Sequence, residues 1–119
     1  MNITCAIIDD EPLALELLEN YVSRVPFLKL TGKYTSAIEA LARIKEDGTQ
    51  LLFLDIQMPD LNGLEFSRII DSSTKVVFTT AFSEYAIESY RSQALDYLLK
   101  PINFTDFMNA ANKALKWFE

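Results

Sequence analysis

The 119-residue sequence contains no histidine, and this absence removes several kinds of site at once. Without histidine, the chain cannot build a histidine metal centre, a histidine general base or a histidine phosphocarrier. Cysteine is nearly as scarce, because Cys5 is the only one and cannot form an internal disulfide. Its position inside the apolar run 3–8 predicts a buried structural thiol.

Long apolar runs are also missing. None approaches the roughly 20 residues that a helix needs to span a bilayer, and the N-terminus lacks the basic and then apolar pattern of a signal peptide. We therefore expect a cytoplasmic protein with no membrane partner. Positive charge is in deficit as well, since 11 basic residues face 17 acidic ones and the formal net charge is −6. This balance argues against direct binding of nucleic acid by this domain.

Apolar runs alternate with segments of helical periodicity, and the length of the chain suits a single domain. Strands are predicted at residues 3–8, 27–34, 51–54, 75–80 and 94–99. Helices are predicted from Pro12 to Arg24, between the caps Ser36 and Gly48, from Leu64 to Ile70, from Ser83 to about Tyr90, and from Asn103 onward. Periodicity places these side chains on buried stripes: Leu13, Leu17, Leu18 and Tyr21; Ile38, Leu41 and Ile44; Phe107, Met108, Ala111, Leu115 and Phe118.

Five strands that each precede a helix predict a parallel sheet covered on both faces. Right-handed crossovers favour a flavodoxin-like doubly wound α/β fold, (βα)5, with strand order 2-1-3-4-5. Ligands of such sheets bind outside the carboxyl ends of the strands, at the switch point between the first and third strands. Any functional side chains should therefore gather at this edge.

Polar residues stand at the predicted strand ends. Asp9 and Asp10 follow the first strand, Asp55 the third, Thr80 closes the fourth and Lys100 follows the fifth. Two carboxylates about 4–5 Å apart repel by roughly 3–4 kcal/mol at an effective dielectric near 20, so such a cluster favours a bound cation. Oxygen ligands without histidine or thiolate indicate a hard ion, and Mg²⁺ bridges carboxylates to phosphoryl oxygens.

Asp55 is then a carboxylate able to attack phosphorus and form an aspartyl phosphate. Lys100 and the Thr80 hydroxyl would reach other phosphoryl oxygens. Each residue also has an ordinary structural role: Asp10 as a helix cap, Asp55 as the start of a loop, Thr80 as a strand end and Lys100 as a solvated charge. These ordinary roles would all have to coincide at strand ends, which favours the phosphoryl site.

Four segments resemble the signature of response-regulator receiver domains of two-component signalling: Asp9-Asp10-Glu11, residues 55–59, Thr80-Ala81 and residues 97–101. The resemblance implies Asp55 as phosphoacceptor, Asp9 and Asp10 as the acidic pair for Mg²⁺, the Gln57 backbone carbonyl as a further ligand, Lys100 as phosphoryl contact, Thr80 and Tyr97 as switch pair, and a cis bond before Pro101. It also implies a sensor histidine kinase as partner and no enzymatic function.

Longer segments, residues 9–12, 79–82, 84–86 and 94–102, resemble receivers that precede a LytTR-type DNA-binding domain, the LytR/AlgR family. This resemblance implies that residues 1–119 are the receiver of a longer transcriptional regulator with a C-terminal effector domain. In the family, the fourth helix, fifth strand and fifth helix carry output and often a homodimer interface. The aromatic residues there are Phe82, Tyr85, Tyr90, Tyr97, Phe104 and Trp117, each of which could instead pack the core.

Three other functions fit parts of the sequence. A flavin-binding electron carrier shares this fold, but it holds a phosphate with hydroxyls and glycines after the first strand, where this chain has Asp9-Asp10-Glu11. A Mg²⁺-dependent phosphatase with an aspartyl nucleophile usually carries a second carboxylate where this chain has Gln57. A receiver that acts alone through protein–protein contacts is the alternative to one with an attached output domain.

Overall fold

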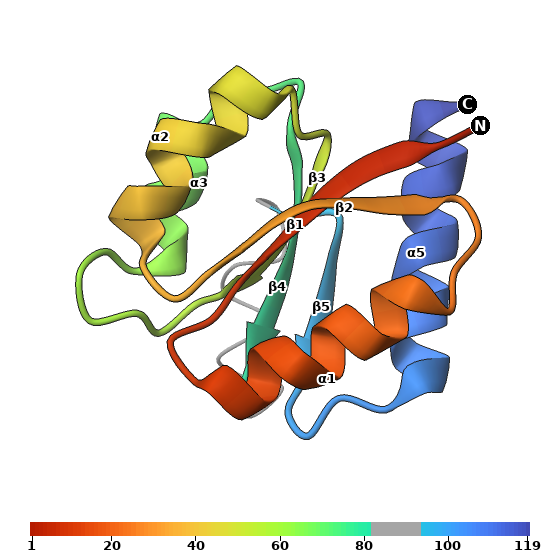
Figure 1. Cartoon of the computed structure of the whole chain (residues 1–119), viewed down its shortest axis with the longest axis horizontal. Helices are drawn as coiled ribbons and strands as arrows, with labels where there is room; N and C mark the ends of the chain where they lie inside the picture. The colour runs from red at the N-terminus through yellow and green to blue at the C-terminus, as the bar shows by residue number, and fades with distance from the viewer. Residues whose placement is uncertain (82–93) are drawn as a thin grey trace.

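A computed structural model describes residues 1–81 and 94–119, which form a single parallel sheet with helices on both faces (Figure 1). The strands are β1 (Ile3–Ile8), β2 (Leu28–Tyr34), β3 (Leu51–Asp55), β4 (Lys75–Thr80) and β5 (Asp96–Leu99). Their order is β2-β1-β3-β4-β5, and every neighbouring pair is parallel. The predicted flavodoxin-like α/β fold and its strand order are confirmed.

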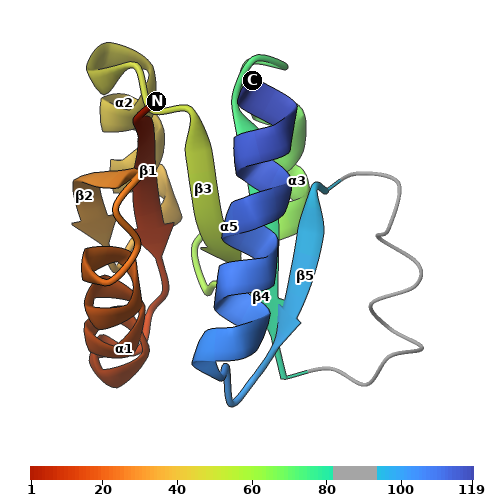
Figure 2. The ribbon, with the colours of Figure 1, turned by 90° about the vertical axis from the view of Figure 1, so that its right-hand side faces the viewer.

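The described helices are α1 (Pro12–Ser23), α2 (Ala37–Asp47), α3 (Gly63–Ile69) and α5 (Phe104–Phe118). Helices α1 and α5 cover one face of the sheet, while α2 and α3 cover the other (Figures 1 and 2). The helix expected from Ser83 to Tyr90 lies outside the described residues. Elsewhere the predicted ends of strands and helices shift by one or two residues.

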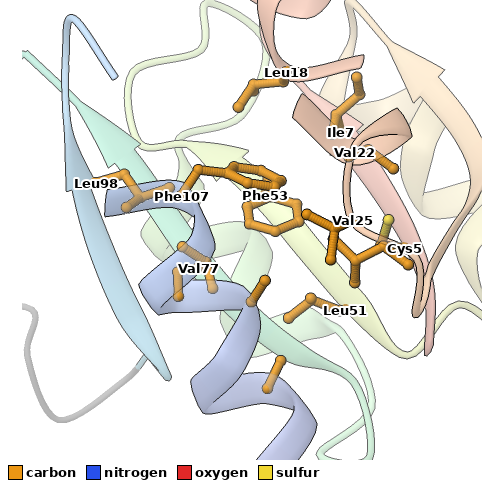
Figure 3. Packing of buried hydrophobic residues seen from close by; sticks show 14 of the residues in the cluster. Cys5, Ile7, Leu18, Val22, Val25, Leu51, Phe53, Val77, Leu98 and Phe107 are labelled. Atoms are coloured by element: carbon orange, nitrogen blue, oxygen red, sulfur yellow. The ribbon is translucent and has the colours of Figure 1, made fainter. Parts of the chain in front are cut away.

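Two apolar cores lie on opposite sides of the sheet because successive strand residues point to opposite faces. On β3, Phe53 belongs to the core under α1 and α5, and Leu54 to the core under α2 and α3. Figure 3 shows the first core, in which the rings of Phe53 and Phe107 stack with centroids 4.7 Å apart. Cys5 lies in the same core, and burial raises the pKa of its thiol to about 12, so it is the inert buried thiol that we predicted.

Capping side chains begin three of the helices. Ser36 accepts a hydrogen bond from the Glu39 amide at the start of α2, and Asn103 accepts one from the Asp106 amide at the start of α5. Asn62 caps α3 in the same way. These polar caps satisfy backbone N–H groups that the first helical turn leaves without partners.

The buried stripe predicted for α1 was wrong in two members. Leu13 is 79% exposed and Leu17 is 38% exposed, while Leu15, Leu18 and Val22 pack against the sheet. Both stripes are apolar in the first turns of the helix. The stripe that starts at Leu13 then runs into polar residues, whereas the one that starts at Leu15 stays apolar to the last turn, and this continuity decides which stripe is buried.

The stripe of α2 shows a similar error, because Ile38 is 59% exposed and Ala37 is buried in its place. The prediction for α5 fared better. Phe107 and Ala111 are buried, and the remaining members of that stripe pack against the same core. No helix within residues 1–81 or 94–119 is long and apolar enough to cross a membrane.

Replacing Phe107 by alanine should lower the free energy of unfolding by about 3–5 kcal/mol, because the ring is fully buried and stacked on Phe53. Urea unfolding followed by circular dichroism measures this loss. Trp117→Ala is the matched control on the same helix, since Trp117 is 57% exposed and its loss should cost much less. Similar losses for the two variants would show that α5 is not anchored through Phe107.

Candidate functional site

Three carboxylates meet at the carboxyl edge of the sheet. Asp9 and Asp10 directly follow β1, and Asp55 is the last residue of β3. One carboxylate oxygen from each of the three lies within 4.8 Å of the others. Asp9 and Asp55 are buried, whereas Asp10 is exposed and faces solvent. The predicted convergence of these side chains follows from the sheet order, which places β1 beside β3.

Each buried carboxylate is fixed by the loop that follows it. Oδ1 of Asp9 accepts a hydrogen bond of 2.9 Å from the Glu11 amide, and Oδ1 of Asp55 accepts one of 3.1 Å from the Gln57 amide. Both donors stand two residues after the aspartate, an arrangement typical of Asx turns. The second oxygen of each carboxylate is thereby turned toward the shared space.

Lys100 reaches into that space from the end of β5. Its Nζ lies 2.8 Å from Asp9 Oδ2, 3.4 Å from Asp55 Oδ2 and 3.6 Å from Glu11 Oε1. The Lys100 amide donates to the Thr80 carbonyl at 2.7 Å, which fixes the backbone from which the side chain extends. The peptide bond between Lys100 and Pro101 is cis, the isomer that the resemblance implied.

Burial and the neighbouring Asp9 charge raise the pKa of Asp55 to about 6. The Lys100 ammonium and the Gln57 amide oppose this rise without cancelling it. Burial acts to lower the pKa of Lys100, but the carboxylates of Asp9 and Asp55 outweigh it and hold that pKa above its usual range. The site therefore combines a carboxylate whose ionised form is disfavoured with a lysine that stays charged at neutral pH.

Thr80 and Tyr97 lie on adjacent strands and on the same face of the sheet. Thr80 is buried at the end of β4, and β4 pairs with β5 so that Phe78 faces Tyr97. The rings of Phe78 and Tyr97 lie 6.2 Å apart, within the core under α2 and α3. The arrangement places the predicted switch pair in one packed layer beside the carboxylates.

The aromatic residues predicted for the output face differ in their exposure and in their contacts. Trp117 is exposed, with its ring centroid 4.2 Å from the Lys75 ammonium. Phe104 packs edge-to-face on Tyr21 with centroids 5.4 Å apart, so its ring serves the contact between α5 and α1. The three remaining members lie outside the described residues: Phe82, Tyr85 and Tyr90.

Two acidic side chains make contacts that the sequence did not predict. Glu11 entered the predictions only as the last residue of the acidic segment 9–11. In the structure its side chain makes no capping bond to α1 and lies 3.6 Å from the Lys100 ammonium. Asp60 was not among the predicted site residues, and the structure shows its carboxylate accepting hydrogen bonds from Ser36 and Ile38 at the start of α2. The acidic run at 9–11 could have pointed to Glu11, whereas nothing local in the sequence indicates the partner of Asp60.

The oxygen atoms gathered here suit a small hard cation. Three carboxylates supply acceptor-only oxygens within 4.8 Å, and no histidine or thiolate competes for the ion. The same group also places a carboxylate, Asp55, within reach of a fixed ammonium. Such a site can bind an anion that carries a metal ion with it, as phosphoryl groups do.

Comparison with known proteins defines the class. The family model of the response regulator receiver domain matches residues 5–112 of this chain. Because this match covers most of the sequence, the protein belongs to that family and is a response regulator receiver domain. The parallel five-stranded sheet and the site at its carboxyl edge agree with this membership.

Two relatives show which proteins contain a similar receiver domain. The chain is 46% identical over 103 residues to an uncharacterized response regulatory protein of Shewanella oneidensis, covering 85% of this chain and 44% of that protein. It is 41% identical over 99 residues to the transcriptional regulatory protein BtsR of Escherichia coli strain K12, covering 82% of this chain and 41% of BtsR. The chain thus spans less than half the length of these relatives.

A solved structure shows the same fold. The response regulatory domain of protein mrkE from Klebsiella pneumoniae superposes with a TM-score of 0.83 at 26% sequence identity, and the match covers 96% of both chains. The similarity therefore extends over the whole receiver fold, from β1 to α5.

The raised pKa of Asp55 predicts a stabilising substitution. Its folded pKa, about 6, exceeds the usual aspartate value of about 3.9, so the folded state holds the proton more tightly than the unfolded state. The free energy of unfolding therefore falls as pH rises from about 4 to 6. Above pH 6 the full cost of burying the ionised Asp55 carboxylate is present. Without divalent ions, Asp55→Asn should raise the free energy of unfolding by about 1–3 kcal/mol at pH 7.5, and the gain should disappear near pH 4.

Urea unfolding in the presence of EDTA at the two pH values measures this effect. Asp71→Asn is the matched control, because hydrogen bonds from Ser73 hold the pKa of Asp71 below its usual range. That substitution should not stabilise the domain at pH 7.5. An Asp55→Asn variant no more stable than the wild type at pH 7.5 would contradict the prediction.

Proposed function

We propose that this receiver domain accepts a phosphoryl group from a sensor histidine kinase on Asp55, with Mg²⁺, and that the modification controls an attached output domain. The observation that carries the proposal is the meeting of Asp9, Asp10, Asp55 and Lys100 at one edge of the sheet. In the transfer, an Asp55 carboxylate oxygen attacks phosphorus while the bond between phosphorus and the kinase histidine nitrogen breaks. The electron pair stays on that nitrogen, which takes up a proton from water.

The residues that would hold Mg²⁺ are Asp9, Asp10, Asp55 and the backbone carbonyl of Gln57. A bound ion would neutralise charge on the phosphoryl oxygens during transfer. The chain itself supplies the nucleophile and its orientation. The Gln57 amide holds Oδ1 of Asp55, so Oδ2 is the oxygen that faces the incoming group.

Lys100 serves the site before and after transfer. In the unmodified domain its ammonium bridges Asp9 and Asp55, and it favours the ionised, nucleophilic form of Asp55. A phosphoryl group on Asp55 would place new anionic oxygens beside the same ammonium. The charge-assisted contact can then form without movement of β5.

Thr80 and Tyr97 would carry the modification to the rest of the domain. A phosphoryl oxygen that draws the Thr80 hydroxyl inward would change the space available to Tyr97 in the shared layer. The two arrangements then differ in their contacts with the phosphoryl group, and modification shifts their populations. The output face predicted from the sequence, which includes β5 and α5, is where this change would reach a partner or a second copy of the domain.

Transcriptional output is the proposed use of the signal. BtsR is named a transcriptional regulatory protein, and the chain matches less than half of it. We assign the missing part to a C-terminal DNA-binding effector domain of the LytTR type. Because the receiver carries a net charge of −6, contacts with DNA would belong to the effector domain and not to the receiver.

Phosphorylation at a single site is the direct test. With Mg²⁺ and acetyl phosphate, intact-protein mass spectrometry should show one added phosphoryl group on the wild-type domain. Asp55→Asn should show none, since its amide is not a nucleophile toward phosphorus. The remote control Asp71→Asn should be modified like the wild type. Modification that survives in Asp55→Asn would place the acceptor at another residue.

Mg²⁺ binding gives a second test that does not need phosphorylation. At ten times its dissociation constant, Mg²⁺ should stabilise the wild-type domain by about 1.4 kcal/mol through mass action. Asp10→Asn should remove most of this gain, because it deletes the exposed carboxylate of the cluster. Thermal unfolding with and without Mg²⁺ measures the difference. If Asp10→Asn responds to Mg²⁺ like the wild type, Asp10 is not a metal ligand.

A further inference from the structure

The loop that leaves β3, residues 56–62, is attached to the site at its start and to α2 further on. The Ile56 amide donates to the Thr79 carbonyl at 3.1 Å, and the Gln57 amide donates to Asp55. Three residues later, Oδ2 of Asp60 accepts a 2.7 Å bond from the Ser36 hydroxyl and a 3.2 Å bond from the Ile38 amide. The loop, in which Ile56 and Met58 are buried, is therefore also tied at its exposed Asp60 to the first turn of the neighbouring helix.

Ser36 relays this bond into the helix. Its hydroxyl donates to Asp60 and accepts a 3.3 Å bond from the Glu39 amide, so the carboxylate fixes the direction in which the cap faces. A carboxylate at a helix N-terminus is also favoured by the helix dipole and forms charge-assisted hydrogen bonds. The Ser36 hydroxyl and the Ile38 amide hold the pKa of Asp60 below its usual range, so the acceptor is ionised at neutral pH.

The same segment of chain also holds the other half of the site. The Asp9 amide donates to the carbonyl of Tyr34 at 3.0 Å, two residues before Ser36. The junction between β2 and α2 thus binds Asp9 through its backbone and binds the Gln57 loop through Asp60. This junction therefore connects the two chain segments that supply the proposed metal ligands.

We infer that Asp60 is a positioning residue, which sets the distance between the Asp9 segment and the Gln57 carbonyl through its bonds to Ser36 and Ile38. This inference rests on the proposed Mg²⁺ site. Loss of the bonds would let the loop sample more conformations, and each conformation that misplaces the carbonyl lowers the affinity for the ion. Residues that orient metal ligands from outside the site typically change affinity by tens of fold, and a tether one step further away should act more weakly.

Two substitutions cut the tether from opposite ends. Asp60→Ala removes the acceptor, and Ser36→Ala removes one donor without a change in charge. Isothermal titration with MgCl₂ should show a dissociation constant raised about threefold to tenfold in each variant. Ser36→Thr keeps the capping hydroxyl and should restore wild-type affinity. If Asp60→Ala does not fold, Asp60→Asn is measured in its place, with a smaller expected loss because its amide oxygen still accepts one bond.

A simple loss of negative charge is the competing explanation for Asp60→Ala. Repeating the titration in about 0.5 M KCl separates the two, because salt screens a long-range charge effect but leaves a conformational effect in place. The control pair is Asp71→Ala, which removes the acceptor of a 2.9 Å bond from the Ser73 amide, and Ser73→Ala, which removes the side-chain hydrogen bond to the same carboxylate, before the start of β4. These two variants should bind Mg²⁺ like the wild type.

Hydrogen exchange tests the tether without any metal. In EDTA, the amides of residues 56–58, 60 and 61 and of Ile38 and Glu39 should exchange faster in Asp60→Ala than in the wild type. Unchanged exchange, or normal Mg²⁺ affinity in Ser36→Ala, would overturn the inference. A wild-type domain that binds no Mg²⁺ would defeat the proposed function instead, and exchange in Asp60→Ala would still decide whether the tether holds the loop.

Discussion

The ion pair between Lys100 and the two buried carboxylates is the interaction on which the site depends. Asp9 and Asp55 lie side by side with almost no contact with water, an arrangement that repulsion and desolvation would otherwise oppose. The ammonium that offsets these costs comes from β5, which does not pair with the strands of either aspartate. Three strands are thus joined electrostatically at one edge, in addition to their backbone ladders.

This ion pair does not fully offset the electrostatic cost of the two buried carboxylates. Even with Lys100 in place, the pKa of Asp55 stays near 6, so part of the cost of burying the carboxylate is left unbalanced. A second cation bound beside the carboxylates would relieve that cost. The unmodified cluster therefore favours the binding of a cation at this edge of the sheet.

Much of this could be predicted from the sequence because parallel sheets impose simple rules. Once apolar runs fix the strands, residues such as Asp55 and Lys100 must meet at the carboxyl edge, whatever their separation along the chain. The exposed Leu13 shows the limit, since local periodicity allowed two stripes and packing chose between them. Asp60 shows a deeper limit. Its partner lies on another element, and only the path of the folded loop brings the two together.

The proposed phosphoryl site and the proposed switch residue Tyr97 lie on opposite faces of the sheet, each next to a different core. By the alternation of strand residues, Asp55 and Lys100 share the face of Phe53 and α5, while Tyr97 packs in the core under α2 and α3. Substitutions of core residues remote from Thr80 should therefore combine additively across the sheet. Thr80 is the exception: it lies on the side of Tyr97 but directly follows Thr79, which pairs with Asp55, so a change at Thr80 can reach both sides of the sheet.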